Sequence, residues 1–380
     1  MEKTVYLDYN ATTPIDPEVI DEMLPYIYTS FGNPSSSYLH GRINREAINK
    51  ARKQVANLIN ANPDEIVFTS GGTESNNHAI RGIALANKEK GKHILTSTIE
   101  HPAVLEVCRH LKSLGFEITY VPVDMHGKLN PDDVENAVRS DTVLITIMHA
   151  NNEVGTIQPL TEIASVARQR NIAFHTDASQ SAGKIETDVV RLGVGLLSMA
   201  GHKLYAPKGI GALYIKQGIM VENLMFGAGQ ENGIRPGTEN VPYIVALGKA
   251  CEIAQRDLRK NNAHMYRMRE KLLLGLKQKL GTAVRLNANL DNCLPNTLSI
   301  SFEKVEAHTL TSLIGNEVYI STGSACHAGS VEISPVLKAM NIDIMTAAGT
   351  VRISTGKYTS EEEIDLAIAT ISDKVIKLSS

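Results

Sequence analysis

Residues 66–76 read Ile-Val-Phe-Thr-Ser-Gly-Gly-Thr-Glu-Ser-Asn, and this stretch indicates the kind of fold that the chain adopts. Four strand-forming residues run through a pair of glycines into a helical pattern, which is how a βαβ unit begins. Glycines let backbone amides approach an anion, and a helix N-terminus offers free N–H groups, so Gly72 and Thr73 are candidate phosphate ligands. An ordinary glycine-rich turn with Thr73 as the helix cap explains these residues about as well. The stretch matches neither glycine-rich nucleotide motif.

The same alternation of strand and helix continues on both sides of this stretch. Strand-like runs lie at 66–69, 93–96, 118–121, 143–147 and 172–175, with helical patterns at about 74–90, 102–114, 131–139 and 160–170. Regular alternation predicts an α/β fold in which a mostly parallel central sheet is covered by helices. Ligands of such sheets bind beyond the carboxyl ends of the strands.

The second half of the chain has a different pattern. One long amphipathic, charge-rich helix is expected from about 245 to 280, with a break near residues 260–262. It is followed by a strand at 297–302, a helix near 307–315, a Gly/Ser-rich loop at 321–330 and a strand at 351–354. This part reads as a smaller α+β unit. A chain of 380 residues exceeds the usual size of one domain. We therefore expect a large domain at 15–255 and a small domain formed by 1–14 and 256–380.

Composition excludes several classes of protein. The net charge is −3, Trp is absent and aromatic residues make up 5% of the chain, so neither a nucleic-acid nor a membrane partner is expected. No apolar run is long enough to span a bilayer, and residues 1–5 lack the apolar core of a signal peptide. The expected location is the cytoplasm. No C-x-x-C pair occurs, so neither a metal site nor a disulfide framework is expected.

Two segments carry the groups that point to a cofactor. Asp177 follows the strand at 172–175, where a carboxylate suits a pyridinium nitrogen, although capping of the next helix explains it equally simply. Lys203 follows Gly201-His202, and a single lysine usually lies on the surface. A phosphate loop, a strand-end Asp177, Gln180 and Lys203 in this order on an α/β frame form the layout of a fold-type I pyridoxal phosphate (PLP) enzyme. Lys203 is then its Schiff-base lysine.

Short motifs along nearly the whole chain narrow this layout further. They lie at 6–13 (Tyr-Leu-Asp-Tyr-Asn-Ala-Thr-Thr), 32–36 (Gly-Asn-Pro-Ser-Ser), 100–101 (Glu-His), 150–155 (Ala-Asn-Asn-Glu-Val-Gly), 175–180, 201–203, 235–240 (Arg-Pro-Gly-Thr-Glu-Asn), 323–326 (Gly-Ser-Ala-Cys) and 352–354 (Arg-Ile-Ser). Together they resemble the cysteine desulfurase and selenocysteine lyase family, which has the class V aminotransferase fold and depends on PLP.

The resemblance implies a role for each residue that matches the family's motifs. Lys203 would carry the cofactor and shuttle protons. His101 would stack on the cofactor ring and act as an acid or base. Asp177 would pair with the ring nitrogen, and Gln180 would donate to the phenolic oxygen. The phosphate would be held by Gly72, Thr73 and His202.

Further implied roles concern the substrate and a second subunit. Asn152 would contact the cofactor and, with Arg352, hold the substrate carboxylate, which the planar fork of an arginine binds in a bidentate manner. Read alone, Asn152 is a turn residue and Arg352 an ion-pair residue. Thr238 would reach the phosphate of the neighbouring subunit, which implies a homodimer, although a Pro-Gly turn also explains it.

Cys326 stands among small residues, whereas Cys108 and Cys251 lie in apolar helical patterns and Cys293 precedes Leu-Pro. We therefore expect Cys326 to be the reactive thiol and the other three to be inert. The resemblance implies conversion of L-cysteine to L-alanine, with a persulfide on Cys326 that is passed to a sulfur-acceptor protein, as in iron–sulfur cluster assembly.

Three features depart from the pattern of iron–sulfur-assembly desulfurases. Ala200 replaces a phosphate-binding Ser, residues 235–240 contain Arg-Pro-Gly rather than Arg-Ser-Gly, and His327 follows the cysteine. Gly-His-Lys at 201–203, Arg-Pro-Gly-Thr-Glu-Asn at 235–240 and Ala-Cys-His at 325–327 are more similar to selenocysteine lyases. The alternatives are thus a lyase that releases selenide from L-selenocysteine, or a desulfurase that supplies a specialised pathway such as DNA phosphorothioation.

Overall fold

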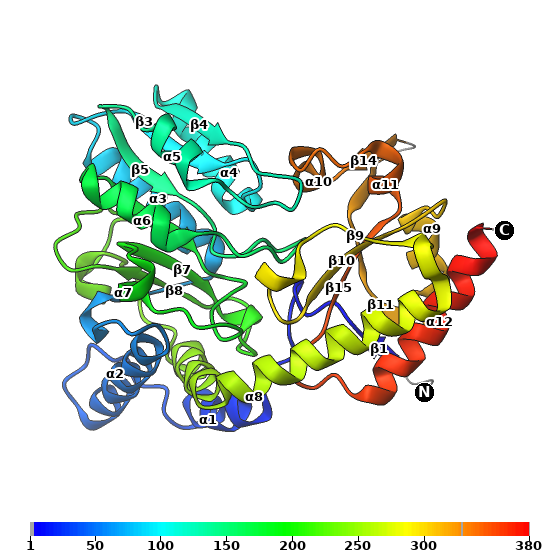
Figure 1. Cartoon of the computed structure of the whole chain (residues 1–380). Helices are drawn as coiled ribbons and strands as arrows, with labels where there is room; N and C mark the ends of the chain where they lie inside the picture. The colour runs from blue at the N-terminus through cyan, green and yellow to red at the C-terminus, as the bar shows by residue number, and fades with distance from the viewer. Residues whose placement is uncertain (1–3, 328–329, 380) are drawn as a thin grey trace.

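A seven-stranded sheet forms the centre of the larger part of the computed structural model, which describes residues 4–327 and 330–379 (Figure 1). The strands stand in the order β2-β8-β7-β6-β5-β3-β4. They are β2 (Ile66–Thr69), β3 (His93–Ser97), β4 (Glu117–Val121), β5 (Thr142–Thr146), β6 (Ala173–Asp177), β7 (Leu196–Ala200) and β8 (Gly211–Ile215). Only β8 runs antiparallel to its neighbours in this sheet, so the predicted α/β fold with a mostly parallel sheet is confirmed.

Helices cover both faces of this sheet because its strands are apolar on both sides. On one face α3 (Gly72–Ala86) and α4 (Pro102–Ser113) pack together on residues such as Val67 and Leu213. The other face, which includes Phe68 and Ala212, packs with α1 (Pro17–Tyr28), α2 (Leu39–Ile59), α5 (Pro131–Ala137) and α6 (Leu160–Gln169). Short helices complete this part, namely η1 (Pro63–Glu65), α7 (Val189–Leu192), η2 (Gly201–Lys203) and η3 (Gln230–Gly233).

A second core combines the start of the chain with its C-terminal third. The antiparallel sheet β12-β15-β10-β9 consists of β9 (Val284–Leu286), β10 (Thr297–Phe302), β12 (Ser321–Thr322) and β15 (Thr350–Ser354). β1 (Val5–Tyr6) pairs with β11 (Val318–Tyr319), and α9 (Ala307–Ile314) and α12 (Glu361–Ser379) pack nearby. η4 (Gly281–Ala283) and η5 (Leu290–Asn292) lie in its connections. The division of the chain into two domains stays a prediction.

Helix α8 (Val241–Leu280) runs without interruption for 40 residues from α1 and α2 to α12 (Figure 1). The break expected at residues 260–262 is therefore wrong. Two asparagines there cost a helix only about 0.5 kcal/mol each. Packing against three helices outweighs this cost, and the side chain of Asn262 also donates to the carbonyl of Lys184 at 3.0 Å.

The loop expected at 321–330 is also wrong, because most of it is extended. β13 (Ser324–His327) pairs with β14 (Ser330–Ile333) as an antiparallel hairpin in which Cys326 lies opposite Val331. The small residues of β13 have low strand propensity, so the sequence did not predict a strand there. The strand forms because β13 pairs with β14, which contains β-branched residues. Residues 328–329, between the strands, lie outside the described part. α10 (Pro335–Ala339) and α11 (Ile344–Ala348) follow.

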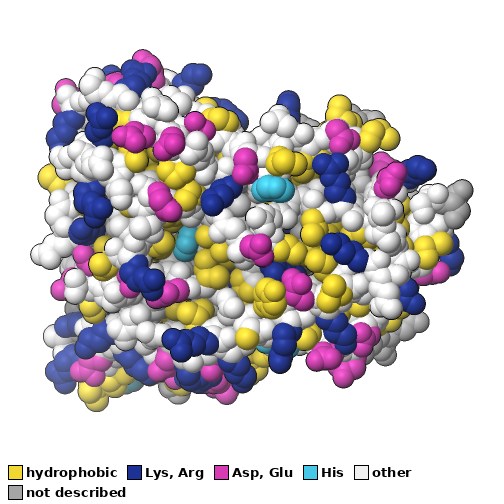
Figure 2. Space-filling model, viewed as in Figure 1, with side chains coloured by type: hydrophobic (Ala, Val, Ile, Leu, Met, Phe, Trp, Pro, Cys, Tyr) yellow, Lys and Arg dark blue, Asp and Glu magenta, His cyan; other side chains and the backbone are white. Residues whose placement is uncertain are grey.

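Positive and negative side chains are mixed over the face shown in Figure 2, in keeping with the small net charge of −3. Among the described residues, no helix is both long and apolar enough to cross a membrane.

Close packing of α8 on α2 generates a stability prediction. A Cβ added at Gly248 would lie 2.5 Å from the Cα of Ala51, a backbone atom that cannot move alone. We expect Gly248→Ala to lower the thermal unfolding midpoint by roughly 2–8 °C, because overpacking exceeds the helix propensity that alanine adds. Differential scanning calorimetry measures this.

The matched control is Gly275→Ala on the same helix, where the nearest atom is the flexible end of the Ile368 side chain. A rotamer change accommodates the added methyl there, so its midpoint should fall less. Equal losses in the two variants would contradict the packing argument.

Candidate active site

A cavity of about 390 Å³ lies beyond the carboxyl ends of the parallel strands, where ligands of α/β sheets bind. It brings together most of the residues singled out from the sequence, although their roles stay predictions. Those that line it are Gly72, Thr73, His101, Asn152, Asp177, Gln180, His202, Lys203 and Arg352.

Lys203 ends the short helix η2, which follows directly on β7. Its Nζ donates to the backbone oxygens of Asn10 at 2.5 Å and Ala11 at 2.6 Å. Burial, together with the positive charge of Arg352, lowers the pKa of Lys203 to about 8. A large share of this amine is therefore neutral near pH 8, as a nucleophile or proton acceptor must be.

Asp177 ends β6, and both of its carboxylate oxygens accept hydrogen bonds. One accepts from the backbone N–H of Ser179 at 2.9 Å, but this bond stabilises a turn, because no helix follows Asp177 directly and the expected helix cap is wrong. The other accepts from Asn76 Nδ2 at 2.7 Å. These bonds fix the carboxylate at the cavity wall, and a carboxylate has lone pairs left for a further donor.

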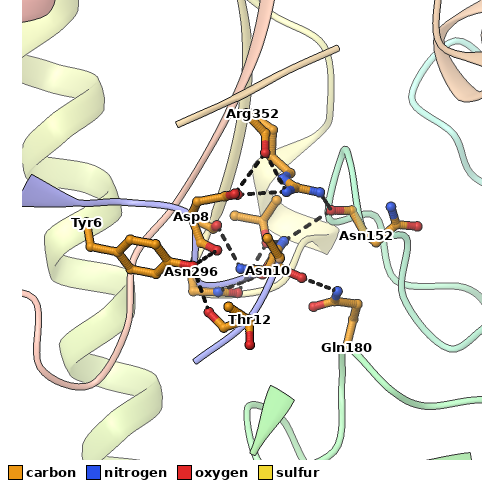
Figure 3. A network of polar contacts seen from close by, with 12 residues as sticks. Tyr6, Asp8, Asn10, Thr12, Asn152, Gln180, Asn296 and Arg352 are labelled. Carbon is orange, nitrogen blue, oxygen red and sulfur yellow. Dashed lines mark hydrogen bonds and ion pairs between the residues drawn. The ribbon is translucent and has the colours of Figure 1, made fainter. Parts of the chain in front are cut away.

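Gln180 is held in place by contacts on both sides of its amide. Its Nε2 donates to the backbone oxygen of Asn10 at 2.9 Å (Figure 3), and its Oε1 accepts from Lys184 Nζ at 2.9 Å. Lys184 is a buried residue that the sequence analysis missed, since a lysine is expected at the surface unless a partner is known.

The first turn of α3 forms a cradle for an anion. A Cβ on Gly72 would lie 3.0 Å from Ser179 Oγ and 3.3 Å from the Cβ of Ala200, so a residue without a side chain fits best here. Ser179 also lines the cavity, and its hydroxyl is a donor that the sequence analysis did not name. Backbone amides, two hydroxyls and an imidazole form a donor set that fits a phosphate.

The two cavity histidines are mainly neutral at pH 7. Burial, with a contribution from the positive Lys203, lowers the pKa of His202 to about 4, and burial also lowers the pKa of His101. His101 caps α4, because its Nδ1 accepts from the backbone N–H of Ala103 at 3.1 Å. This contact assigns the ring proton to Nε2, so the side chain is a cap and a potential donor at once.

Arg352 belongs to a polar network at the edge of the cavity (Figure 3). It forms an ion pair with Asp8 at 2.7 Å, donates to Ser321 Oγ at 2.9 Å and reaches the backbone oxygen of Asn152 at 3.2 Å. The ion-pair interpretation of Arg352 thus holds alongside its place in the cavity. Asp8 was quoted only as part of a motif, and its role as the partner of Arg352 needed the structure.

Thr238 is a predicted site residue that lies outside this cavity. It is exposed between η3 and α8, where it does not line the cavity of its own chain. Cys326 has a described backbone in β13, but its side chain lies outside what the structure describes. Cys108 and Cys251 are buried, with a pKa raised by burial to about 12 in Cys108 and raised also in Cys251. Burial raises the pKa of Cys293 to about 11, so these three thiols are inert at neutral pH.

A lysine, a strand-end carboxylate and a helix N-terminus surround one cavity, an arrangement that fits a fold-type I PLP enzyme. Residues 5–366 match the aminotransferase class-V family. A curated relative, the cysteine desulfurase IscS of Methanosarcina thermophila, is 47% identical over 377 residues, which are 99% of this chain and 93% of the relative. The chain therefore belongs to the class-V aminotransferases and, within them, to the cysteine desulfurases.

Solved structures agree with this assignment. A NifS-like protein superposes with a TM-score of 0.92 at 39% identity, covering 98% of this chain and all of the other. SspA in complex with cysteine superposes with a TM-score of 0.82 at 38% identity, covering 94% of this chain and 100% of the other.

The lowered pKa of Lys203 can be tested by chemical labelling. In protein stripped of any cofactor, we expect modification of Lys203 by acetic anhydride to reach half its maximal rate at about pH 8. Removal of the nearby positive charge in Arg352→Gln should move this midpoint upward. Mass spectrometry of peptides measures both, with the exposed Lys208 as an internal reference. A midpoint near the ordinary lysine value of about 10.4 would contradict the burial argument.

Proposed function

We propose that the protein is a PLP-dependent cysteine desulfurase that converts L-cysteine to L-alanine and holds the removed sulfur as a persulfide on Cys326. The observation that carries the proposal is the position of Lys203, which lies with a lowered pKa in one cavity with Asp177, Gln180 and the start of α3. SspA, a structural neighbour, was solved with cysteine, which supports L-cysteine as the substrate.

The cavity residues fit the parts of PLP one by one. Lys203 would hold the aldehyde carbon, and Asp177 would keep the ring nitrogen protonated. Gly72, Thr73 and His202 would hold the phosphate. Ser179 Oγ, which like the methyl group of Ala200 lies close to Gly72, would supply the hydroxyl donor that Ala200 lacks. His101 would cover the ring, and Gln180 would donate to the phenolic oxygen. Bound PLP would supply an electron sink that stabilises negative charge at the substrate α-carbon.

The residues of this chain would bind the substrate and move its protons. Arg352, oriented by Asp8, would hold the substrate carboxylate together with Asn152. Lys203 would take the α-proton, a task that suits an amine with a pKa of about 8. His101 would donate a proton from Nε2.

Cys326 would remove the sulfur as a thiolate nucleophile. Its sulfur attacks the substrate sulfur, so that an S–S bond forms while the C–S bond breaks. The electron pair of the C–S bond passes to the substrate carbon, which gains a proton and ends as the methyl group of alanine. The persulfide left on Cys326 is then available to an acceptor protein.

Two finer statements complete the proposal. The acceptor would be a protein of iron–sulfur cluster assembly, which is the role that the resemblance implies. The active form would be a homodimer in which the exposed Thr238 reaches the phosphate of the other subunit. The relatives named as cysteine desulfurases favour L-cysteine over L-selenocysteine as the main substrate.

Replacement of the central lysine tests the proposal as a whole. We expect Lys203→Ala to lose the visible absorption of bound PLP and to lower alanine release from L-cysteine at least about 10³-fold, because a general acid–base group is lost along with the covalent link. Absorption spectra and an alanine assay measure this. Lys208→Ala, an exposed lysine five residues on, is the matched control and should keep both properties. A colourless Lys203→Ala that still turned over cysteine would refute the proposal.

Replacement of Cys326 separates the two substrates. Cys326→Ala should abolish alanine release from L-cysteine, because no other described thiol is reactive, while its PLP spectrum stays unchanged. The same assay with L-selenocysteine tests the alternative. Loss with both substrates supports a persulfide-forming desulfurase, whereas retention with L-selenocysteine alone identifies a lyase. Cys293→Ala, which removes a thiol whose pKa is raised to about 11, is the control and should keep its activity.

A further inference from the structure

A lysine that none of the catalytic roles uses lies buried behind the cavity wall. Lys184 is 5% exposed, and its Nζ lies 3.0 Å from Asn10 Oδ1 and 2.9 Å from Gln180 Oε1. Both partners are neutral amide oxygens. Burial holds the pKa of Lys184 well below its ordinary value, and the positive charges of Lys203 and Arg352 act in the same direction. A buried amine is costly to retain unless its contacts serve a purpose.

The contact with Lys184 determines which way the amide of Gln180 points. A protonated lysine amine has no acceptor, so it selects Oε1 rather than Nε2 of the glutamine, and the reverse orientation would place two donors against each other. A neutral amine also donates to Oε1, and the contact with the backbone oxygen of Asn10 selects the same orientation in either protonation state. The reverse orientation would set Gln180 Oε1 against the backbone oxygen of Asn10, which now accepts from Nε2 at 2.9 Å. Two contacts therefore agree on one orientation.

This orientation leaves a donor for the cavity. The amide nitrogen of Gln180 carries two hydrogens, and the bond to Asn10 uses one of them. Gln180 lines the cavity, so the second hydrogen is available to a ligand there. A flipped amide would instead offer an acceptor, which repels the phenolate oxygen of PLP.

We propose that Lys184 is a positioning residue that locks the amide of Gln180 so that its nitrogen, and not its oxygen, faces the cofactor. The role rests on the proposed PLP-dependent function and deepens it. The same amine also fixes the side chain of Asn10, whose backbone oxygen receives both Gln180 Nε2 and Lys203 Nζ. One buried amine thus contacts both Gln180 and the residue whose carbonyl oxygen accepts from Lys203.

The pH titration of the visible band of the holoenzyme tests this role without relying on activity. A donor beside the phenolic oxygen stabilises its anionic form and lowers the pKa of the bound chromophore. Lys184→Met keeps the length of the side chain but removes the donors. It should raise the midpoint of the titration by about half to one pH unit, the effect of one neutral hydrogen bond. The matched control is Asn262→Ala, which removes a bond to the backbone of Lys184 and leaves its amine in place. Its midpoint should equal that of the wild type.

A double-mutant cycle distinguishes positioning from a direct effect of charge. If Lys184 acts through Gln180, then Lys184→Met should not shift the midpoint in a Gln180→Ala background. An equal shift in both backgrounds, or no shift in the wild-type background, would overturn the proposal. If Lys184→Met does not yield folded holoenzyme, Lys184→Gln, whose amide keeps a donor for Gln180 Oε1 but carries no charge, should leave the midpoint at the wild-type value, and a shift in both backgrounds would overturn the proposal.

Failure of this role is separable from failure of the proposed function. Wild-type protein that has no visible band and releases no alanine from L-cysteine would contradict the function itself. If the wild type shows the visible band and turns over cysteine, but Lys184→Met leaves the titration midpoint unchanged, only the positioning role is overturned.

Discussion

Asn10 links the C-terminal third of the chain to the residues that line the cavity. Its N–H donates to Ser354 Oγ, and its carbonyl oxygen accepts from both Lys203 and Gln180. Its side chain bonds Asn296 (Figure 3), and it also bonds Thr297 and Lys184. Every polar group of this residue is thereby paired, as burial requires. The proposed cofactor lysine, Lys203, is thus held by a segment of the chain that lies almost 200 residues before it.

Desolvation gives the cavity its chemical character. Burial lowers the pKa values of Lys203, His101 and His202, so each group is largely or partly neutral at neutral pH. Arg352 keeps its charge, and Asp8 neutralises it within the same network. A site of this kind presents donors that are already dehydrated and oriented. It therefore suits an anionic cofactor and a substrate carboxylate, because charge-assisted hydrogen bonds are strongest where water is excluded.

Sequence patterns predicted the parts of this protein that depend on local periodicity. The strands at 66–69 and 297–302 and the strand-end position of Asp177 follow from runs of apolar residues and appear where expected. The supposed break at 260–262 failed because packing across three helices outweighed two weak helix formers. The hairpin of β13 and β14 depends on pairing between two segments, neither of which carried a strong strand signal alone.

In the candidate site, too, the sequence predicted residues that lie in short motifs but not the contacts between separate segments. Motifs pointed to Lys203 and Gln180, but not to Lys184 or to the pairing of Asp8 with Arg352. These contacts join residues whose spacing along the chain has no repeating pattern, from four residues to 344. The sequence alone does not distinguish a buried lysine that bonds two amides from an ordinary surface lysine, because the bonding partners are known only from the fold.

The most direct test of the central claim is to locate the cofactor linkage. Purified protein is reduced with borohydride, digested and mapped by mass spectrometry. The account predicts that the phosphopyridoxyl group is attached to Lys203 alone, in the peptide that contains Gly201-His202-Lys203. Attachment to Lys184 or another lysine, or no modified peptide from protein that turns over cysteine, would contradict it.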